Sequence, residues 1–199
     1  IVIGMVLPLV GCCGLVGDAI SAFIYSRSEM ISSLNVYLCA LACSDIIIIL
    51  TAFFLFFLEN MRKRIFSANF YFAVLAPYMF PLGLTAQTFS VFLTVTAAFD
   101  CFVLVAGWPA MLVLISLLAI AYNSPHVFEI FVIDCWSVRH GAPSKDVCPT
   151  ELRNNETYVV VYYAWLYTLV MAAGPVLLLV AINSAILLSL RRQQSADSQ

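Results

Sequence analysis

Asp45 is the only charged residue in the apolar run 31–58. Placing a carboxylate near the centre of a bilayer costs about 2.5–3.5 kcal/mol of free energy on insertion scales, so such a residue usually has a function. Suitable functions are holding a cation, relaying a proton and sensing movement between helices. A buried acid that a neighbouring helix merely satisfies is the alternative. The position predicts a functional site inside the membrane.

The composition is that of a membrane protein. Hydrophobic residues make up 63% of the 199 residues and charged residues 10%, with a mean hydropathy of +1.01 and a net charge of −2. A soluble domain would carry about 25% charged residues. The apolar residues also form blocks long enough to cross a bilayer, which takes about 20 residues. We therefore predict an all-α, polytopic helix bundle embedded in a lipid bilayer.

The apolar blocks predict five spans and one long polar loop. The spans fall at about 1–24, 31–58, 70–105, 110–133 and 158–190, with an outer loop at 134–157. The third and fourth spans are separated by Gly107-Trp108-Pro109, a sequence that turns the chain. Pro125 is expected to bend or end the fourth span.

The polar loop carries two signs of an oxidising compartment. Cys135 and Cys148 are spaced for a disulfide within the loop, and Asn155-Glu156-Thr157 is an acceptor pattern for N-glycosylation. Together they predict an extracytoplasmic loop. With five spans, the chain would then start outside the plasma membrane and end inside.

The distribution of basic residues points the other way. This topology leaves three arginines inside and six basic residues outside, the latter being Arg62, Lys63, Arg64, Arg139, Lys145 and Arg153. The positive-inside rule would invert the chain. We follow the loop chemistry, because the rule counts whole proteins and both ends of this chain look cut from something longer.

Several motifs together resemble one family. The pattern Asn35…Leu41-Ala42-x-x-Asp45 resembles the second helix of rhodopsin-like G-protein-coupled receptors. Weaker matches are Gly17-Asp18 in the first helix, Phe99-Asp100-Cys101-Phe102 at the end of the third, and Gly174-Pro175 with Asn183 in the fifth. The resemblance covers five of the family's seven helices. The amino-acid sequence around these motifs is similar to that of nematode receptors of the FMRFamide neuropeptide type.

The resemblance implies a sodium pocket around Asp45. Ser90 corresponds to the family's hydroxyl opposite this acid, and a carboxylate with a hydroxyl begins the oxygen shell of a hard cation. From the residues alone, Ser90 also lies on a small or polar face of the third span that recurs every three or four residues. Asp18 would add a second carboxylate, and two close acids are expected to share a proton.

The elements that transmit activation are only partly present. Pro175 matches the fifth-helix proline, but Cys101 follows Asp100 where the family has an arginine that contacts the heterotrimeric G protein. The second inner loop is nearly absent. The family's outer cysteine is missing from residues 70–80, which leaves Cys135 to pair with Cys148 or not at all. Either a faulty gene model or a real adaptation explains these departures.

Acidic residues on the outer side are the candidate ligand contacts. Glu59, Glu129 and Asp134 would pair with the arginine of an amidated peptide, while Gln87 lies deeper. The alternative is that these are solvated loop acids.

Two other functions compete with a peptide receptor. One is a chemosensory receptor for a small metabolite. The other is a secondary transporter that relays ions through Asp18, Asp45 and Asp100, although no internal repeat supports it. An enzyme is not expected, because His126 and His140 lack metal-ligand spacing and no nucleophile motif occurs. Neither a nucleic-acid partner nor a cofactor other than a bound sodium ion is expected.

Overall fold

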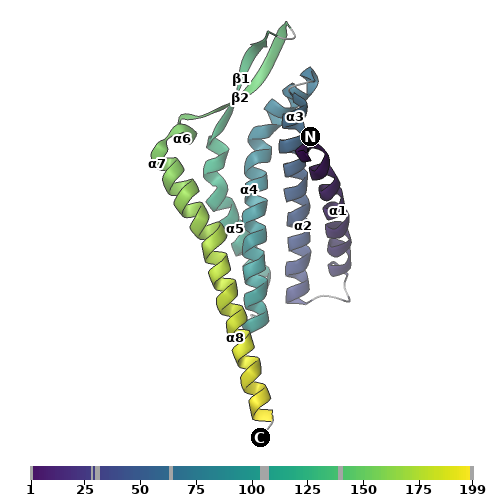
Figure 1. Cartoon of the computed structure of the whole chain (residues 1–199), viewed down its shortest axis with the longest axis vertical. Helices are drawn as coiled ribbons and strands as arrows, with labels where there is room; N and C mark the ends of the chain where they lie inside the picture. The colour runs from purple at the N-terminus through teal and green to yellow at the C-terminus, as the bar shows by residue number, and fades with distance from the viewer. Residues whose placement is uncertain are drawn as a thin grey trace.

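The computed structural model is a bundle of long helices capped at one end by a β-hairpin (Figure 1). It describes residues 2–27, 29, 32–62, 65–103, 108–138 and 141–197. Five helices in these segments are long and apolar enough to cross a membrane. The predicted turn residue Gly107 lies outside the described residues, as do Lys63, Arg64, Arg139 and His140.

The first two spans form an antiparallel pair. Helix α1 (Val2–Tyr25) packs along α2 (Ser33–Phe53), which continues through the π-helical segment η2 (Phe54–Leu58) into α3 (Glu59–Arg62). The side chain of Ser32 caps α2 by accepting a 3.3 Å hydrogen bond from the backbone N–H of Asn35. The second span thus reaches four residues beyond the predicted end.

Helix α4 (Phe66–Val103) is the central element of the bundle. Its 38 residues make it about 57 Å long at 1.5 Å per residue, more than the roughly 30 Å of a bilayer's hydrocarbon core. It packs against α2, α5 (Trp108–Asn123) and α8 (Gly174–Asp197). Gly83 allows the close approach to α2, because a Cβ there would lie 2.8 Å from Oγ1 of Thr51.

The fourth span ends earlier than its sequence suggests. Helix α5 tightens into the 3-10 segment η3 (Ser124–Phe128), and strand β1 (Ile130–Ser137) then pairs antiparallel with β2 (Ala142–Pro149). The range 110–133 placed residues 130–133 in a helix, whereas they form the start of a strand. The hairpin turns at Gly141, whose φ of 59° favours glycine.

The last span is one continuous helical rod, which we call helix five. It runs from α7 (Glu156–Tyr158) through the π-helical segments η4 (Val159–Leu166) and η5 (Thr168–Ala173) into α8. The wide turns end at Gly174 and Pro175. Pro175 has no N–H to donate, and a Cβ at Gly174 would lie 2.6 Å from the Leu169 carbonyl oxygen.

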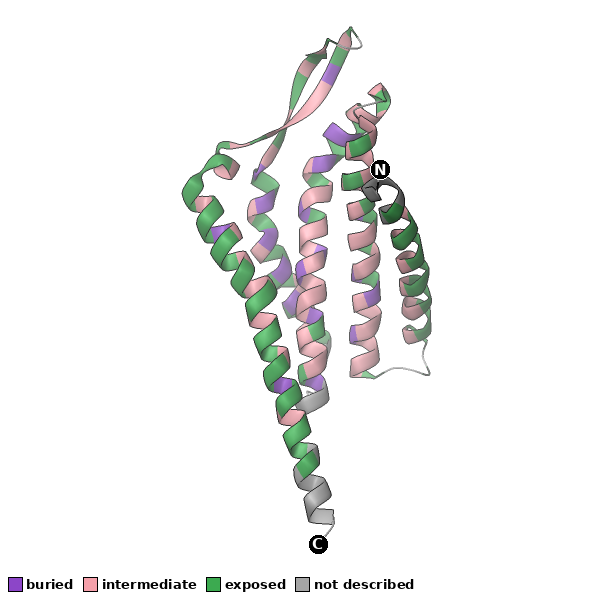
Figure 2. Ribbon diagram, viewed as in Figure 1, coloured by how far each residue is buried: buried purple, intermediate pink, exposed green. Residues whose placement is uncertain are grey.

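Few side chains are fully buried, and most of those lie along α4 and its contacts (Figure 2). Tyr37, Leu93 and Ile115 form the core cluster between α2, α4 and α5. Large aliphatic side chains cover the outside of α1 and helix five. Apolar side chains on the outer surface are the opposite of the pattern in a soluble protein. They are expected in a bilayer, where lipid rather than water contacts that surface.

Candidate functional site

The predicted site residues fall at three levels along the bundle. Asp45 and Ser90 belong to the central parts of α2 and α4, Glu129 stands between η3 and the hairpin, and Asp100 lies in the last turn of α4, away from the hairpin. Each level is held by contacts between different helices. They are described in that order.

At the middle level, the structure brings Asp45 and Ser90 together. The Ser90 hydroxyl donates a 3.0 Å hydrogen bond to Oδ1 of Asp45, and the Asp45 side chain is half-buried. Asp18 on α1 is near enough to interact electrostatically with the Asp45 carboxylate. The two acids and the hydroxyl thus share one region between three helices.

These oxygen donors fit a hard cation better than a transition metal. No cluster of three or more histidine, cysteine or acidic residues suited to a metal occurs among the described residues. A carboxylate, a neighbouring hydroxyl and a second acidic side chain instead match the oxygen ligands that hard cations prefer. A sodium ion would take its protein contacts from Asp45 and Ser90.

At the hairpin end, Glu129 is the centre of a buried polar cluster. Its side chain is 0% exposed, and four groups bind it. Oε1 accepts from Tyr158 at 2.7 Å and lies 2.7 Å from Nδ1 of His126. Oε2 accepts from Arg153 at 2.7 Å and from Tyr163 at 2.5 Å. The alternative interpretation of Glu129 as a solvated loop acid is therefore wrong, and its role as a ligand contact stays a prediction.

The charge on Glu129 is stabilised despite its burial. Burial alone would raise the pKa of this carboxyl, but the hydrogen bonds from Tyr163 and Tyr158, together with His126, hold the pKa below its usual value. The acid is thus an anion clamped between η3, α6 (Glu151–Asn154) and helix five. These contacts hold the start of the hairpin in place against α6 and helix five.

The other two predicted ligand acids also have partners within the chain. Glu59 binds Arg62 at 2.7 Å, and Arg62 reaches Asp146 on β2 at 3.0 Å. Arg62 thereby joins α3 to the hairpin. Asp134 pairs with Lys145 across the hairpin at 2.5 Å and stays 85% exposed.

Gln87 lies on a face of α4 that looks toward helix five. Its amide donates a 3.4 Å hydrogen bond to the hydroxyl of Tyr167. Phe80 lies seven residues earlier on the same helical face, next to the guanidinium of Arg153. We call this set of half-buried or buried groups the polar column: Phe80, Gln87, Glu129, Arg153, Tyr163 and Tyr167.

The predicted disulfide between Cys135 and Cys148 is contradicted. Both thiols are free, and the hairpin register places Cys135 opposite Ser144 and Cys148 opposite Phe131. The cysteines are therefore four residues apart along the hairpin, about 13 Å at strand spacing, and a disulfide requires Cα atoms within about 7 Å. Asn155 is exposed, and its side-chain oxygen caps α7 at 3.1 Å from the N–H of Tyr158.

At the opposite end, Asp100 is buried at 5% exposure. The Ser33 hydroxyl donates a 2.5 Å hydrogen bond to its Oδ2, while Oδ1 has no hydrogen-bond partner in the described part of the chain. The side chain of Cys101 lies outside the described residues. The polar contact between Ser33 and Asp100 escaped the sequence reading, since nothing in the pattern pairs residues 67 positions apart.

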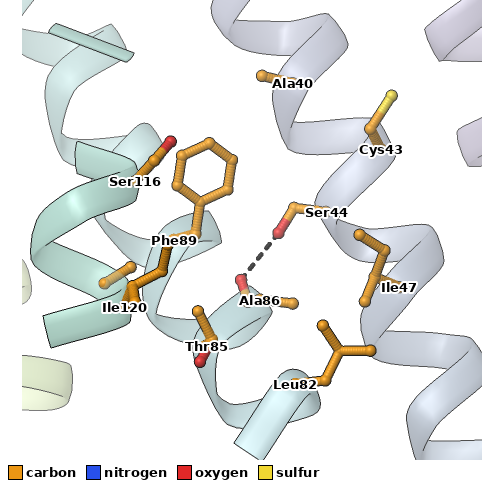
Figure 3. Close-up of a pocket in the computed structure, with 11 residues that line it drawn as sticks. Ala40, Cys43, Ser44, Ile47, Leu82, Thr85, Ala86, Phe89, Ser116 and Ile120 are labelled. Carbon is orange, nitrogen blue, oxygen red and sulfur yellow. Dashed lines mark hydrogen bonds between the residues drawn. The ribbon is translucent and has the colours of Figure 1, made fainter. Parts of the chain in front are cut away.

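A separate apolar groove runs between α2, α4 and α5 (Figure 3). Its volume is about 310 Å³, and Ala40, Cys43, Ile47, Leu82, Phe89 and Ile120 are among its lining residues. Three hydroxyls line it, but each is already used: Ser44 donates to the Ala86 carbonyl, Thr85 to Pro81 and Ser116 to Leu112. Its surface suits an apolar group rather than a peptide.

Comparison with known proteins gives two informative relatives. No family model matches the chain. The chain is 59% identical, over its whole length, to the probable G-protein coupled receptor frpr-1 of Caenorhabditis elegans. It is 30% identical, over 96% of its length, to the FMRFamide receptor of Drosophila melanogaster. Both relatives are named as receptors and neither as an enzyme.

The chain spans 60% of the nematode relative's length and 38% of the fly receptor's. The nematode alignment runs over 227 positions, more than the 199 residues of the chain, so the relative has residues in this region that the chain lacks. The short connection between Asp100 and Trp108 is where we expected such a gap.

Proposed function

We propose that the chain is a member of the rhodopsin-like G-protein-coupled receptors and supplies five membrane helices of a receptor activated by an FMRFamide-like neuropeptide. The identity to a probable receptor over the whole chain and the similarity to a named FMRFamide receptor support this proposal. The five apolar helices and the hairpin at one end agree with it.

The polar column is the observation that carries the peptide assignment. An amidated peptide that ends in arginine and phenylalanine needs an acid for the guanidinium, aromatic surface for the ring and an amide partner for its end. The column offers Glu129, the rings of Phe80 and Tyr163, and Gln87 with Tyr167, all between α4 and helix five.

The test is a signalling assay on the receptor that contains this chain. Cells expressing it are exposed to a panel of peptides that end in Arg-Phe-amide, and intracellular calcium is recorded. The same peptides with a free carboxylate serve as matched controls. We expect a response to amidated peptides only. No response to any amidated peptide would favour the metabolite-receptor alternative.

We propose that the receptor lies in the plasma membrane with the hairpin outside. The N-terminal end of α1 and the hairpin lie at the same end of the bundle (Figure 1), so both would face out. The exposed Asn155 in its acceptor pattern supports this orientation. Glycosidase treatment should increase the gel mobility of the wild-type receptor but not that of Asn155→Gln.

We propose a sodium ion at the middle level. The Ser90–Asp45 contact presents a hydroxyl and a carboxylate together, and Asp18 is a second acidic side chain that interacts with Asp45. Sodium in the wild-type receptor should reduce agonist-peptide affinity, as expected of an ion that stabilises the unactivated arrangement. Asp45→Asn should abolish this sodium effect. A full sodium effect in that variant would exclude the site.

The G-protein partner is proposed for the complete receptor. Cys101 stands where the family's arginine contacts the G protein. If that arginine carries coupling in this receptor as well, Cys101→Arg should increase peptide-stimulated G-protein activation, measured as nucleotide exchange in membranes. Unchanged exchange would show that coupling does not depend on this position.

A further inference from the structure

Arg153 occupies the one charged acceptor of the polar column. Its Nη1 lies 2.7 Å from Oε2 of Glu129, and its guanidinium lies 5.4 Å from the Phe80 ring centroid and 5.9 Å from that of Tyr163. An acid with two flanking aromatic rings is the environment that an arginine of a ligand would require. The chain already supplies such an arginine from α6.

We propose that Arg153 is an internal competitor, and that the arginine of a peptide ligand replaces it on Glu129. This inference rests on the proposed peptide-receptor function. It goes further by naming the acid that binds the peptide arginine and the side chain that occupies this acid before the peptide binds. In the structure described above, Glu129 is closed to a ligand. Binding requires the Arg153 side chain to leave.

The exposure of the two partners supports an exchange. The Glu129 side chain is 0% exposed, whereas that of Arg153 is 39% exposed. His126, on the other side of the carboxylate, is buried at 1%. Arg153 is therefore far more exposed than the acid that it binds. A rotation of this side chain would free one acceptor position on Oε2, which Tyr163 also contacts.

Glu129 keeps most of its partners when Arg153 leaves. Tyr158 and Tyr163 still donate to it, and His126 stays at 2.7 Å. The backbone also holds its place, because Thr150 binds the Glu129 carbonyl through its N–H at 2.8 Å and the Phe128 carbonyl through its hydroxyl at 2.7 Å. The acid is thus preorganised for a second guanidinium.

The column extends below this acid in a direction that suits the rest of the ligand. Phe80 and Gln87 lie two turns apart on α4, and Tyr163 and Tyr167 lie four residues apart on helix five. A peptide arginine on Glu129 would therefore place the following aromatic residue and amide toward the Gln87–Tyr167 contact.

The test is competition binding to membranes that contain the full receptor. Two peptides are compared, one ending in Arg-Phe-amide and one in which neutral citrulline replaces the arginine. In Arg153→Gln the arginine peptide should bind about tenfold more tightly, because one competing charge-assisted hydrogen bond is gone. The citrulline peptide should bind equally to variant and wild type, and Glu129→Gln should abolish the preference for arginine.

Two controls separate competition from a structural role. Arg62→Gln removes another paired arginine, one bound to Glu59 and Asp146 and not to Glu129, and it should leave both affinities unchanged. Arg153→Lys retains the charge without the planar fork and should give a smaller gain, which keeps the proposal testable if the glutamine variant does not fold.

The outcomes are distinct. Equal weakening of both peptides in Arg153→Gln would show that Arg153 only supports the fold, and unchanged affinities would show that no exchange occurs. Each result overturns the internal competitor but leaves the peptide receptor standing. If neither peptide binds the wild-type receptor, the proposed function itself fails, together with this inference.

Discussion

The Ser33 hydroxyl donates a 2.5 Å hydrogen bond to Oδ2 of Asp100 and so joins α2 to α4 at the end opposite the hairpin. Asp100 is buried, and its Oδ1 has no hydrogen-bond partner among the described residues. A single donor thus offsets the cost of burying this carboxyl. The contact is the polar counterpart of the apolar Tyr37–Leu93 packing that lies close by in the same helix pair.

Ser33→Ala should destabilise the bundle by about 1–3 kcal/mol, because it leaves a buried acceptor without its donor. A thermal unfolding assay in detergent would report this as a lower midpoint. Ser26→Ala is the matched control, since the exposed Ser26 hydroxyl binds only the Phe23 carbonyl of its own helix. Equal midpoints for both variants would show that Asp100 does not depend on Ser33.

Glu129→Gln should destabilise the hairpin end by about 3–5 kcal/mol, the range for breaking a buried ion pair. The effect should depend on pH. Since the folded pKa lies below the usual value, the stabilisation is complete above the unfolded pKa of about 4.3 and is lost as pH falls through the lower folded value. Unfolding midpoints of the wild type should therefore drop at acidic pH.

The same acid titration should be much weaker in Glu129→Gln, because glutamine carries no ionisable carboxyl. Asp134→Asn provides the comparison. Asp134 is 85% exposed in its pair with Lys145, so its loss should change stability little at any pH. Parallel pH profiles for Glu129→Gln and the wild type would contradict the role given to Glu129.

Gly83→Ala should weaken the packing of α2 on α4. The new Cβ would lie 2.8 Å from Oγ1 of Thr51 and 3.2 Å from its Cβ, so one helix must shift, at a cost of about 1–3 kcal/mol. Gly17→Ala is a stringent control, because a Cβ there meets nothing within 4 Å. Alanine should be neutral or mildly favourable at that helical position. Equal stability of the two variants would refute the close approach.

Asp18→Asn should weaken the proposed sodium effect on peptide binding. The substitution removes one of two interacting carboxylates and keeps the side-chain shape. We expect the sodium concentration for half-maximal effect to rise roughly three- to tenfold, equivalent to about 0.7–1.4 kcal/mol. A sodium titration of peptide affinity in both receptors measures it. An unaltered titration would remove Asp18 from the pocket.

The sequence predicted the elements whose patterns are local. Long apolar blocks identified five spans, and the resemblance of the second and third spans to the receptor family identified the contact between Asp45 and Ser90. The strand at Ile130 was missed because its apolar residues continue the hydrophobicity of the preceding helix. Its β-branched residues and the glycine at 141 were available signals.

Pairings between distant residues for which the resemblance gave no guide could not be predicted. The hairpin register separates Cys135 from Cys148, although their spacing suits a small loop. Likewise, nothing local shows that Glu129 is enclosed by Arg153 and two tyrosines from other segments. From the sequence alone, an acid in a polar loop is predicted to be solvated. Only the position of the helix that follows shows that such an acid is enclosed. Burial decides its chemistry, and tertiary packing decides burial.

Photo-crosslinking tests the polar column most directly as the peptide site. The terminal phenylalanine of an amidated peptide is replaced by benzoylphenylalanine, the complex with the full receptor is irradiated, and the modified residues are mapped by mass spectrometry. We expect attachment to α4 and helix five around Gln87 and Tyr167, prevented by excess unlabelled peptide. Attachment confined to the hairpin tip or to the apolar groove of Figure 3 would contradict a peptide site in the column.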